Sequence, residues 1–166
     1  MRSALPLGLC LCVPLLGPLG CADDSAAEPA PLFPTEYAAS YTEVRGCRAS
    51  TEHDFARVRV LADPDAVGPY LARDRDFPVG AVVLKAEYDF ADPTCQGPIA
   101  RWTVMVREAA GSSPEALDWH WQDVSANRQV KTENEARCIG CHTGCGVPPE
   151  GYLGTCTVEA SGDALR

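Results

Sequence analysis

The middle of the chain alternates hydrophobic and polar residues with the two-residue period of β-strands. In residues 55–62 (FARVRVLA) small and branched apolar residues alternate with two arginines, which predicts a half-buried strand. Residues 81–90 and 100–109 are rich in valine and aromatic residues and are also strand-like. Residues 117–124 (LDWHWQDV) form a further aromatic strand. The order of these segments predicts an antiparallel sheet.

Three segments around the strands have helical signals. In residues 35–46 three apolar residues share one helical face. Asp63 and Pro64 suit the N-cap and first position of a short helix. Thr132 or Asn134 can cap another helix, which leads into a cysteine-rich segment. We therefore expect an α+β fold, an antiparallel sheet with a few helices at its ends.

The N-terminal segment has the pattern of an export signal. Residues 1–20 are apolar but broken by prolines, and they are too short to span a membrane as a helix. The step Leu19-Gly20-Cys21 resembles a bacterial lipobox, which predicts acylation of Cys21 after cleavage; an ordinary signal peptide with an incidental cysteine is the alternative. Residues 21–34 would form a tether and residues 35–166 the domain. The expected location is the periplasmic face of a membrane or the cell surface.

The charge restricts the partners. The formal net charge is −9, so polyanions are repelled, and nucleic acid is not expected as a partner. We expect contact with a membrane only through the N-terminal lipid. A basic redox protein would suit the acidic surface.

The sequence CIGCH at residues 138–142 carries the most specific chemical signal. Cys-x-x-Cys-His is the signature of covalent c-type haem attachment. Cys138 and Cys141 would bond the porphyrin, and His142 would bind the iron as the proximal ligand. The motif predicts one haem c per chain.

Two other interpretations use the same thiols. Cys138, Cys141, Cys145 and Cys156 could close a four-thiolate zinc site. However, exported cysteines tend to oxidise, and zinc leaves His142 without a role. A redox disulfide between Cys138 and Cys141 lacks the preceding βαβ pattern of thioredoxin-like proteins. Haem is therefore the favoured interpretation.

Four further cysteines remain after the haem thiols and Cys21 are set aside. Cys145 and Cys156 would close a short loop that contains two prolines and three glycines. Cys47 and Cys95 would then tie the start of the domain to a central loop. Three pairings are formally open, and we prefer these two disulfides.

The order of segments resembles the cytochrome P-460 family, which also includes the β-type cytochromes c′. The resemblance covers residues 37–156: an early helix, a strand and helix, a Phe-Pro-x-Gly turn into the strand FPVGAVVLKAEY, the strands WTVMVRE and DWHWQDV, and a C-terminal Cys-x-x-Cys-His. It implies a c-type haem, an open distal site with hydroxylamine or nitric oxide chemistry, and frequent homodimers. The four extra cysteines are not part of the family pattern.

In the P-460 enzymes a lysine is cross-linked to the porphyrin edge, whereas the β-type cytochromes c′ lack this bond. Lys85 lies in the matching strand, and its alternative role is that of a solvated strand residue. Lys131, the other lysine, lies in a polar turn. Glu87 and Asp89, on or just after the Lys85 strand, are the candidate distal proton acceptors.

The sixth iron ligand separates the function classes. Met105, His53 and His120 are the standard candidates, but Met105 suits packing, and His53 suits a structural or solvent-facing position. His120 would be exposed or would form a wall of the pocket. A five-coordinate iron follows, which would bind or oxidise a small nitrogen ligand.

Two alternatives remain open. A lipid-tethered electron carrier would need a six-coordinate, low-spin iron, ligated through Met105 or His120. A zinc- or disulfide-stabilised binding lipoprotein would need no haem.

Overall fold

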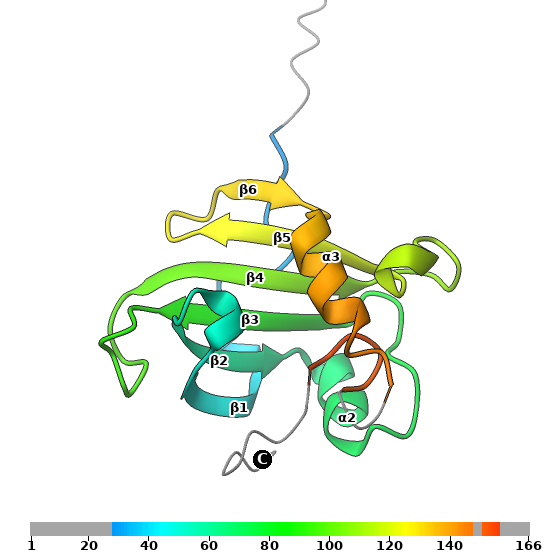
Figure 1. The fold of residues 1–166 in the computed structure, drawn as a ribbon, viewed down its shortest axis with the longest axis horizontal. Helices are drawn as coiled ribbons and strands as arrows, with labels where there is room; N and C mark the ends of the chain where they lie inside the picture. Colours follow the sequence, from blue (N-terminus) through cyan, green and yellow to red (C-terminus); the bar gives the residue numbers. More distant parts are fainter. Residues whose placement is uncertain (1–27, 148–150, 157–166) are drawn as a thin grey trace, which may run out of the picture.

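A single antiparallel sheet forms the body of the protein, as the alternating patterns predicted. The structure is a computed structural model and describes residues 28–147 and 151–156. The spatial order of the strands follows the chain: β1 (Thr42–Ala49), β2 (Arg57–Ala62), β3 (Val82–Tyr88), β4 (Ile99–Arg107), β5 (Trp119–Ser125) and β6 (Val130–Glu133) (Figure 1).

Short helices join or cover these strands. They are α1 (Tyr37–Ser40), η1 (Thr51–His53), α2 (Pro64–Ala72), η2 (Pro114–Ala116) and α3 (Ala136–Thr143). Asp63 caps α2 as predicted, because its side chain accepts a hydrogen bond from the backbone N–H of Ala66 at 2.8 Å. Helix α3 lies across the face of the sheet (Figure 1). The described residues contain no helix long and apolar enough to cross a membrane.

The two faces of the sheet carry separate hydrophobic clusters. On the face under α2 and α3, the cluster contains Val60, Val83, Met105, Trp119 and Trp121 among its buried members. On the opposite face, aromatic and branched side chains pack beneath the N-terminal segment; they include Phe33, Leu84, Trp102, Val104 and Val124. Successive side chains of a strand point to opposite faces of the sheet. Both faces are buried, because α2 and α3 cover one face and the N-terminal segment covers the other.

The N-terminal cover begins earlier than the sequence indicated. The backbone N–H of Leu32 donates to Oε1 of Gln122 at 2.9 Å, and Nε2 of Gln122 donates to the carbonyl of Ala30 at 3.1 Å. Phe33 is only 4% exposed. Residues 30–34 were assigned to the tether, but these contacts place them on the folded domain. Residues 1–27, which include the expected signal segment and Cys21, lie outside the described residues.

The helix expected over residues 35–46 is wrong beyond Ser40. Strand β1 begins at Thr42, and Thr42 pairs with Ala62 at the end of β2. Pairing with β2 overrides the weak helical periodicity, since the β-branched residues Thr42 and Val44 suit a strand.

The helix start expected at Thr132 or Asn134 is also displaced. Thr132 pairs with Asp123 in the ladder between β5 and β6, and α3 begins at Ala136 with Glu135 as its N-cap residue. Asn134 has a φ of 48°, and its side-chain oxygen accepts a hydrogen bond from the backbone N–H of Trp121 at 3.0 Å. Asn134 therefore turns the chain from β6 into the helix.

Both preferred disulfides are present. Cys47 in β1 is bonded to Cys95 in the β3–β4 connection, and Cys145 is bonded to Cys156. Cys138 and Cys141 are free thiols. The second bridge removes two of the four thiolates that a zinc site would need. The described residues contain no cluster of three or more potential metal ligands of the His, Cys, Asp or Glu type.

Candidate functional site

A cavity of about 800 Å³ lies between the sheet and α3. Its apolar lining comes from the sheet and includes Val60, Val83, Met105 and Trp121. Its other wall is the cysteine-rich helix. The cavity therefore lies between the hydrophobic cluster on the α3 side of the sheet and the Cys-x-x-Cys-His motif.

Helix α3 presents the motif to the cavity. Cys138, Cys141 and His142 all line it. The two thiols lie three residues apart on the helix, so they share its face. Burial is the main reason that the pKa of Cys138 is raised, which keeps this thiol protonated near neutrality. Two free thiols therefore face one space together with an imidazole.

The orientation of His142 leaves one ring nitrogen available. Its Nδ1 atom lies 2.6 Å from the carbonyl oxygen of Gly154, so Nδ1 carries a proton and donates it. Nε2 is then unprotonated, which is the form that binds a metal. The ring lies 4.5 Å, centroid to centroid, from Trp121. Burial lowers the pKa of His142 to about 3, so the imidazole is neutral.

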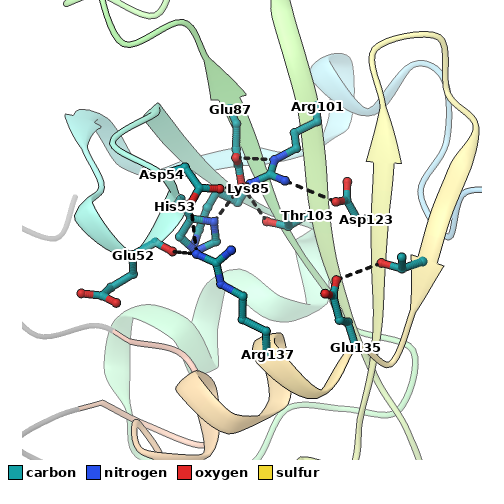
Figure 2. A network of polar contacts seen from close by, with 11 residues as sticks. Glu52, His53, Asp54, Lys85, Glu87, Arg101, Thr103, Asp123, Glu135 and Arg137 are labelled. Carbon is teal, nitrogen blue, oxygen red and sulfur yellow. Dashed lines mark hydrogen bonds and ion pairs between the residues drawn. The ribbon is translucent and has the colours of Figure 1, made fainter.

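A polar cluster occupies another part of the same cavity (Figure 2). Nζ of Lys85 lies 2.5 Å from Nε2 of His53, and Nδ1 of His53 lies 2.8 Å from Oε1 of Glu87. Because a carboxylate only accepts hydrogen bonds, His53 donates from Nδ1 to Glu87 and accepts from Lys85 at Nε2. A chain of three titratable groups thus leads from the cavity to a buried carboxylate.

Glu87 is held as an ion by its neighbours. Its side chain is 1% exposed, and Nε of Arg101 donates to Oε2 at 2.7 Å. Burial alone would raise the pKa of Glu87, but the hydrogen bonds and charges of His53 and Arg101 outweigh burial and lower the pKa. Arg101 also reaches Oδ2 of Asp123 at 3.4 Å. Figure 2 shows Arg101 between the two carboxylates.

Lys85 is not a solvated strand residue. It lines the cavity, and burial lowers its pKa to about 8, although the charge of Glu87 partly offsets this effect. A substantial fraction of the amine is therefore unprotonated and nucleophilic just above neutral pH.

Arg137 in α3 joins the helix to the loop that carries His53 (Figure 2). Its guanidinium donates to Oδ1 of Asp54 at 3.1 Å and to the carbonyl of Glu52 at 3.5 Å. The helix with the two thiols and the loop with the histidine are therefore connected at the rim of the cavity.

The other sequence candidates are distributed differently. Asp89 is exposed in the turn after β3, where it accepts a hydrogen bond from the N–H of Ala91 at 2.8 Å; it does not line the cavity. His120 is on the opposite face of the sheet from Trp121 and lies 3.0 Å from Glu133. Met105 lines the cavity and pairs in register with Trp121. Only Met105 and His53, of the three candidate sixth ligands, share a space with His142.

Sequence reasoning did not identify Arg101 as a site residue, and it set His53 aside as a structural or solvent-facing residue, although both line the cavity. Arg101 could have been found, because it alternates with Thr103 and Met105 on one face of its strand. His53 lies in η1 between β1 and β2, and no periodicity assigns the direction of such a loop residue.

The lining suits a haem. An apolar floor suits the porphyrin ring, and Arg45 and Arg48, which also line the cavity, supply positive charge for the two carboxylates of a haem. The two thiols and the available Nε2 of His142 provide the attachment and ligation groups of the c-type motif.

A comparison with curated protein sequences finds no significant match. A comparison with family models matches the cytochrome P460 model to residues 34–146. This segment contains the six strands, the polar cluster and the Cys-x-x-Cys-His motif, and it is more than half of the chain. The chain therefore belongs to the cytochrome P460 family, which implies a haem cofactor.

Proposed function

We propose that this protein is a c-type haem protein that binds or oxidises a small nitrogen ligand, such as hydroxylamine or nitric oxide. The main support is that the two free thiols, His142 and the Lys85–His53 pair line one cavity, with Glu87 bonded behind His53. When bound, the haem supplies redox chemistry and an open coordination position. The protein supplies attachment, orientation and proton transfer.

Attachment falls to α3. Cys138 and Cys141 would hold the cofactor covalently, and Nε2 of His142 would bind its iron. The hydrogen bond from Nδ1 to Gly154 fixes the tautomer that leaves Nε2 free. Trp121 limits rotation of the imidazole by packing against its ring.

The proton acceptor for an oxidation is His53, with Glu87 behind it. The sequence offered Glu87 and Asp89 for this role. Asp89 does not line the cavity, and Glu87 is 1% exposed and lies behind Nδ1 of His53. His53 lines the cavity. Nε2 accepts a hydrogen bond from Lys85, so a proton from the ligand reaches His53 through that amine. The carboxylate that accepts from Nδ1 orients the ring and stabilises the imidazolium that forms. Glu87 is thus a positioning residue.

Lys85 is the candidate for a cross-link to the porphyrin edge. It lies in the cavity, and its lowered pKa increases its nucleophilicity. Its hydrogen bond to His53 gives the amine a nearby proton acceptor. Because the new C–N bond would replace a porphyrin C–H bond, the cross-link also needs an external oxidant that takes up two electrons. A cross-linked protein would resemble the P-460 enzymes, and a free Lys85 would resemble the β-type cytochromes c′.

The deciding experiment is an optical spectrum of the exported protein, oxidised and reduced, with and without carbon monoxide. A high-spin reduced spectrum and rapid binding of carbon monoxide support the proposal, because no protein ligand has to dissociate first. A protein that contains zinc and no iron contradicts it.

Electron transfer is the second candidate function. Met105 lines the same cavity as His142, so it remains the candidate sixth ligand of a carrier, whereas His120 is on the other face of the sheet. A low-spin reduced spectrum that is lost in Met105→Leu would favour the carrier.

We also propose export and an N-terminal lipid anchor at Cys21. Support comes from the lipobox-like sequence, and disulfides and haem c both belong to oxidising compartments. Metabolic labelling with a fatty acid should mark the wild type and not Cys21→Ser. An unlabelled wild-type protein would contradict the anchor.

A further inference from the structure

The loop that contains Gly154 touches the most important nitrogen of the site. The carbonyl of Gly154 accepts the Nδ1 hydrogen of His142 at 2.6 Å. Gly154 has a φ of 84°, a conformation that glycine adopts without strain. The direction of this carbonyl therefore depends on the backbone conformation of Gly154, which the neighbouring chain must maintain.

The Cys145–Cys156 disulfide connects both partners of this hydrogen bond. Cys145 follows His142 by three residues, and Cys156 follows Gly154 by two. Sγ of Cys156 itself lies 3.9 Å from Nδ1 of His142. The shortest covalent path from the carbonyl to the imidazole therefore runs through the disulfide.

Other contacts of the loop are individually weak. The N–H of Gly154 donates to the carbonyl of Cys145 at 3.2 Å, and Nε1 of Trp119 donates to the carbonyl of Leu153 at 2.7 Å. Each is a hydrogen bond between neutral groups. They join the loop to β5 and to the segment that follows α3, but hydrogen bonds break more readily than a covalent bond.

We propose that the Cys145–Cys156 disulfide is a positioning device for the axial histidine: it holds the Gly154 carbonyl on Nδ1 of His142 and thereby sets the electron donation of the imidazole to its metal. This inference rests on the proposed haem function. A hydrogen bond from Nδ1 makes the ligating nitrogen more basic, so it strengthens the bond to iron and favours the ferric state.

The disulfide at the other end of the domain provides the matched control. Cys47–Cys95 joins β1 to the β3–β4 connection, and neither cysteine lines the cavity. It also closes a longer loop, with a sequence separation of 48 against 11. Its removal should therefore raise the conformational entropy of the unfolded chain at least as much, without changing the contacts of His142.

The test compares three haem-loaded proteins: wild type, Cys145→Ser/Cys156→Ser and Cys47→Ser/Cys95→Ser. Resonance Raman of the ferrous form measures the iron–histidine stretch, and spectroelectrochemistry measures the reduction potential. In the Cys145/Cys156 variant we expect a lower stretching frequency, a higher potential and a larger five-coordinate fraction after addition of nitric oxide. The Cys47/Cys95 variant should match the wild type in all three.

Hydrogen exchange provides a readout that does not depend on the iron. The N–H groups of Leu153 and Gly154, which bond to Gly146 and Cys145, should exchange faster in the Cys145/Cys156 variant. If that variant does not fold, the folded Cys47→Ser/Cys95→Ser protein, which keeps the Cys145–Cys156 bond, is measured before and after reduction of that bond.

Two results overturn the inference alone: an unchanged stretch and potential after verified loss of the Cys145–Cys156 bond, or equal shifts in both serine variants. A wild type that takes up no haem overturns the proposed function as well, so the two failures are distinguishable.

Discussion

Nζ of Lys85 lies 2.5 Å from Nε2 of His53, although 32 residues separate them in the chain. The contact joins a lysine in the middle of β3 to a histidine in the loop between β1 and β2. It changes the roles of both residues: the lysine is drawn into the cavity, and the histidine becomes the link between the cavity and Glu87.

Removal of the Lys85 charge should stabilise the protein below pH 8. The folded-state pKa of about 8 is below the ordinary value of 10.5, so protonated Lys85 opposes folding. This cost is complete below about pH 8 and disappears as the pH rises past 10.5. Thermal denaturation of Lys85→Met should therefore show a gain over the parent at pH 7 that shrinks at pH 10.

A Cys138→Ala/Cys141→Ala background is the suitable parent for that comparison, because it excludes a porphyrin cross-link. Lys131→Met is the matched control, since Lys131 is exposed. A gain that is the same at both pH values would contradict the assignment.

Loss of the His53–Glu87 pair should slow hydroxylamine oxidation. His53→Gln removes the proton acceptor, and general-base catalysis is worth about 10²-fold or more in rate. Glu87→Gln keeps the shape but removes the charge that stabilises the imidazolium, so kcat should fall more than KM changes. Steady-state kinetics of haem-loaded variants measure both. Asp89→Asn, in an exposed turn, should leave the rate unchanged; a rate loss there would return the role to Asp89.

Arg101→Ala should destabilise the fold. Glu87 is 1% exposed, and without Arg101 it loses a charged hydrogen bond of 2.7 Å. We expect a loss of about 2 kcal/mol in the free energy of unfolding, measured by urea denaturation at pH 7. Arg75→Ala removes an exposed pair with Asp74 and should cost less than about 0.5 kcal/mol.

The ion pair between Glu87 and Arg101 also predicts how the stability of the protein changes in acid. The pKa of Glu87 is lowered in the folded state, so its contribution to stability is present above the unfolded-state value and is lost as the pH falls through the folded-state value. The stability advantage of the wild type over Glu87→Gln should therefore diminish in acid. An advantage that grows as the pH falls would show that Glu87 is protonated in the native protein.

Covalent haem should depend on the two thiols of α3. Periplasmically matured wild type should retain haem stain on a denaturing gel, and Cys138→Ala/Cys141→Ala should lose it, because the thioether bonds cannot form. Cys47→Ser/Cys95→Ser should keep the stain, since these residues are already bonded to each other. Stain that survives the loss of Cys138 and Cys141 would rule out this attachment.

Met105→Leu should leave the reduced spectrum nearly unchanged. Met105 is 6% exposed and belongs to the cluster with Val83 and Trp121, which accounts for it as a packing residue. Optical spectra before and after reduction provide the measurement. A change from low to high spin in the variant would identify Met105 as an iron ligand.

The sequence by itself determined the parts of this protein that local patterns encode. Alternation marked β2, richness in valine and aromatic residues marked β3, β4 and β5, and the pair Asp63-Pro64 marked the start of α2. The spacing of Cys138, Cys141 and His142 marked the chemistry, and the leftover cysteines indicated the two disulfides. These signals are local because they depend on side-chain periodicity, caps and covalent reach.

Only the tertiary structure decided what depends on distant partners. Residues 42–49 are a strand because β2 pairs with them, and β6 ends in a turn because Asn134 bonds to Trp121. His53 enters the cavity from a loop, whose direction no periodicity encodes, and Asp89 leaves it because β3 ends at Tyr88. The Gly154 carbonyl reaches His142 because a disulfide and a positive φ return the chain to α3.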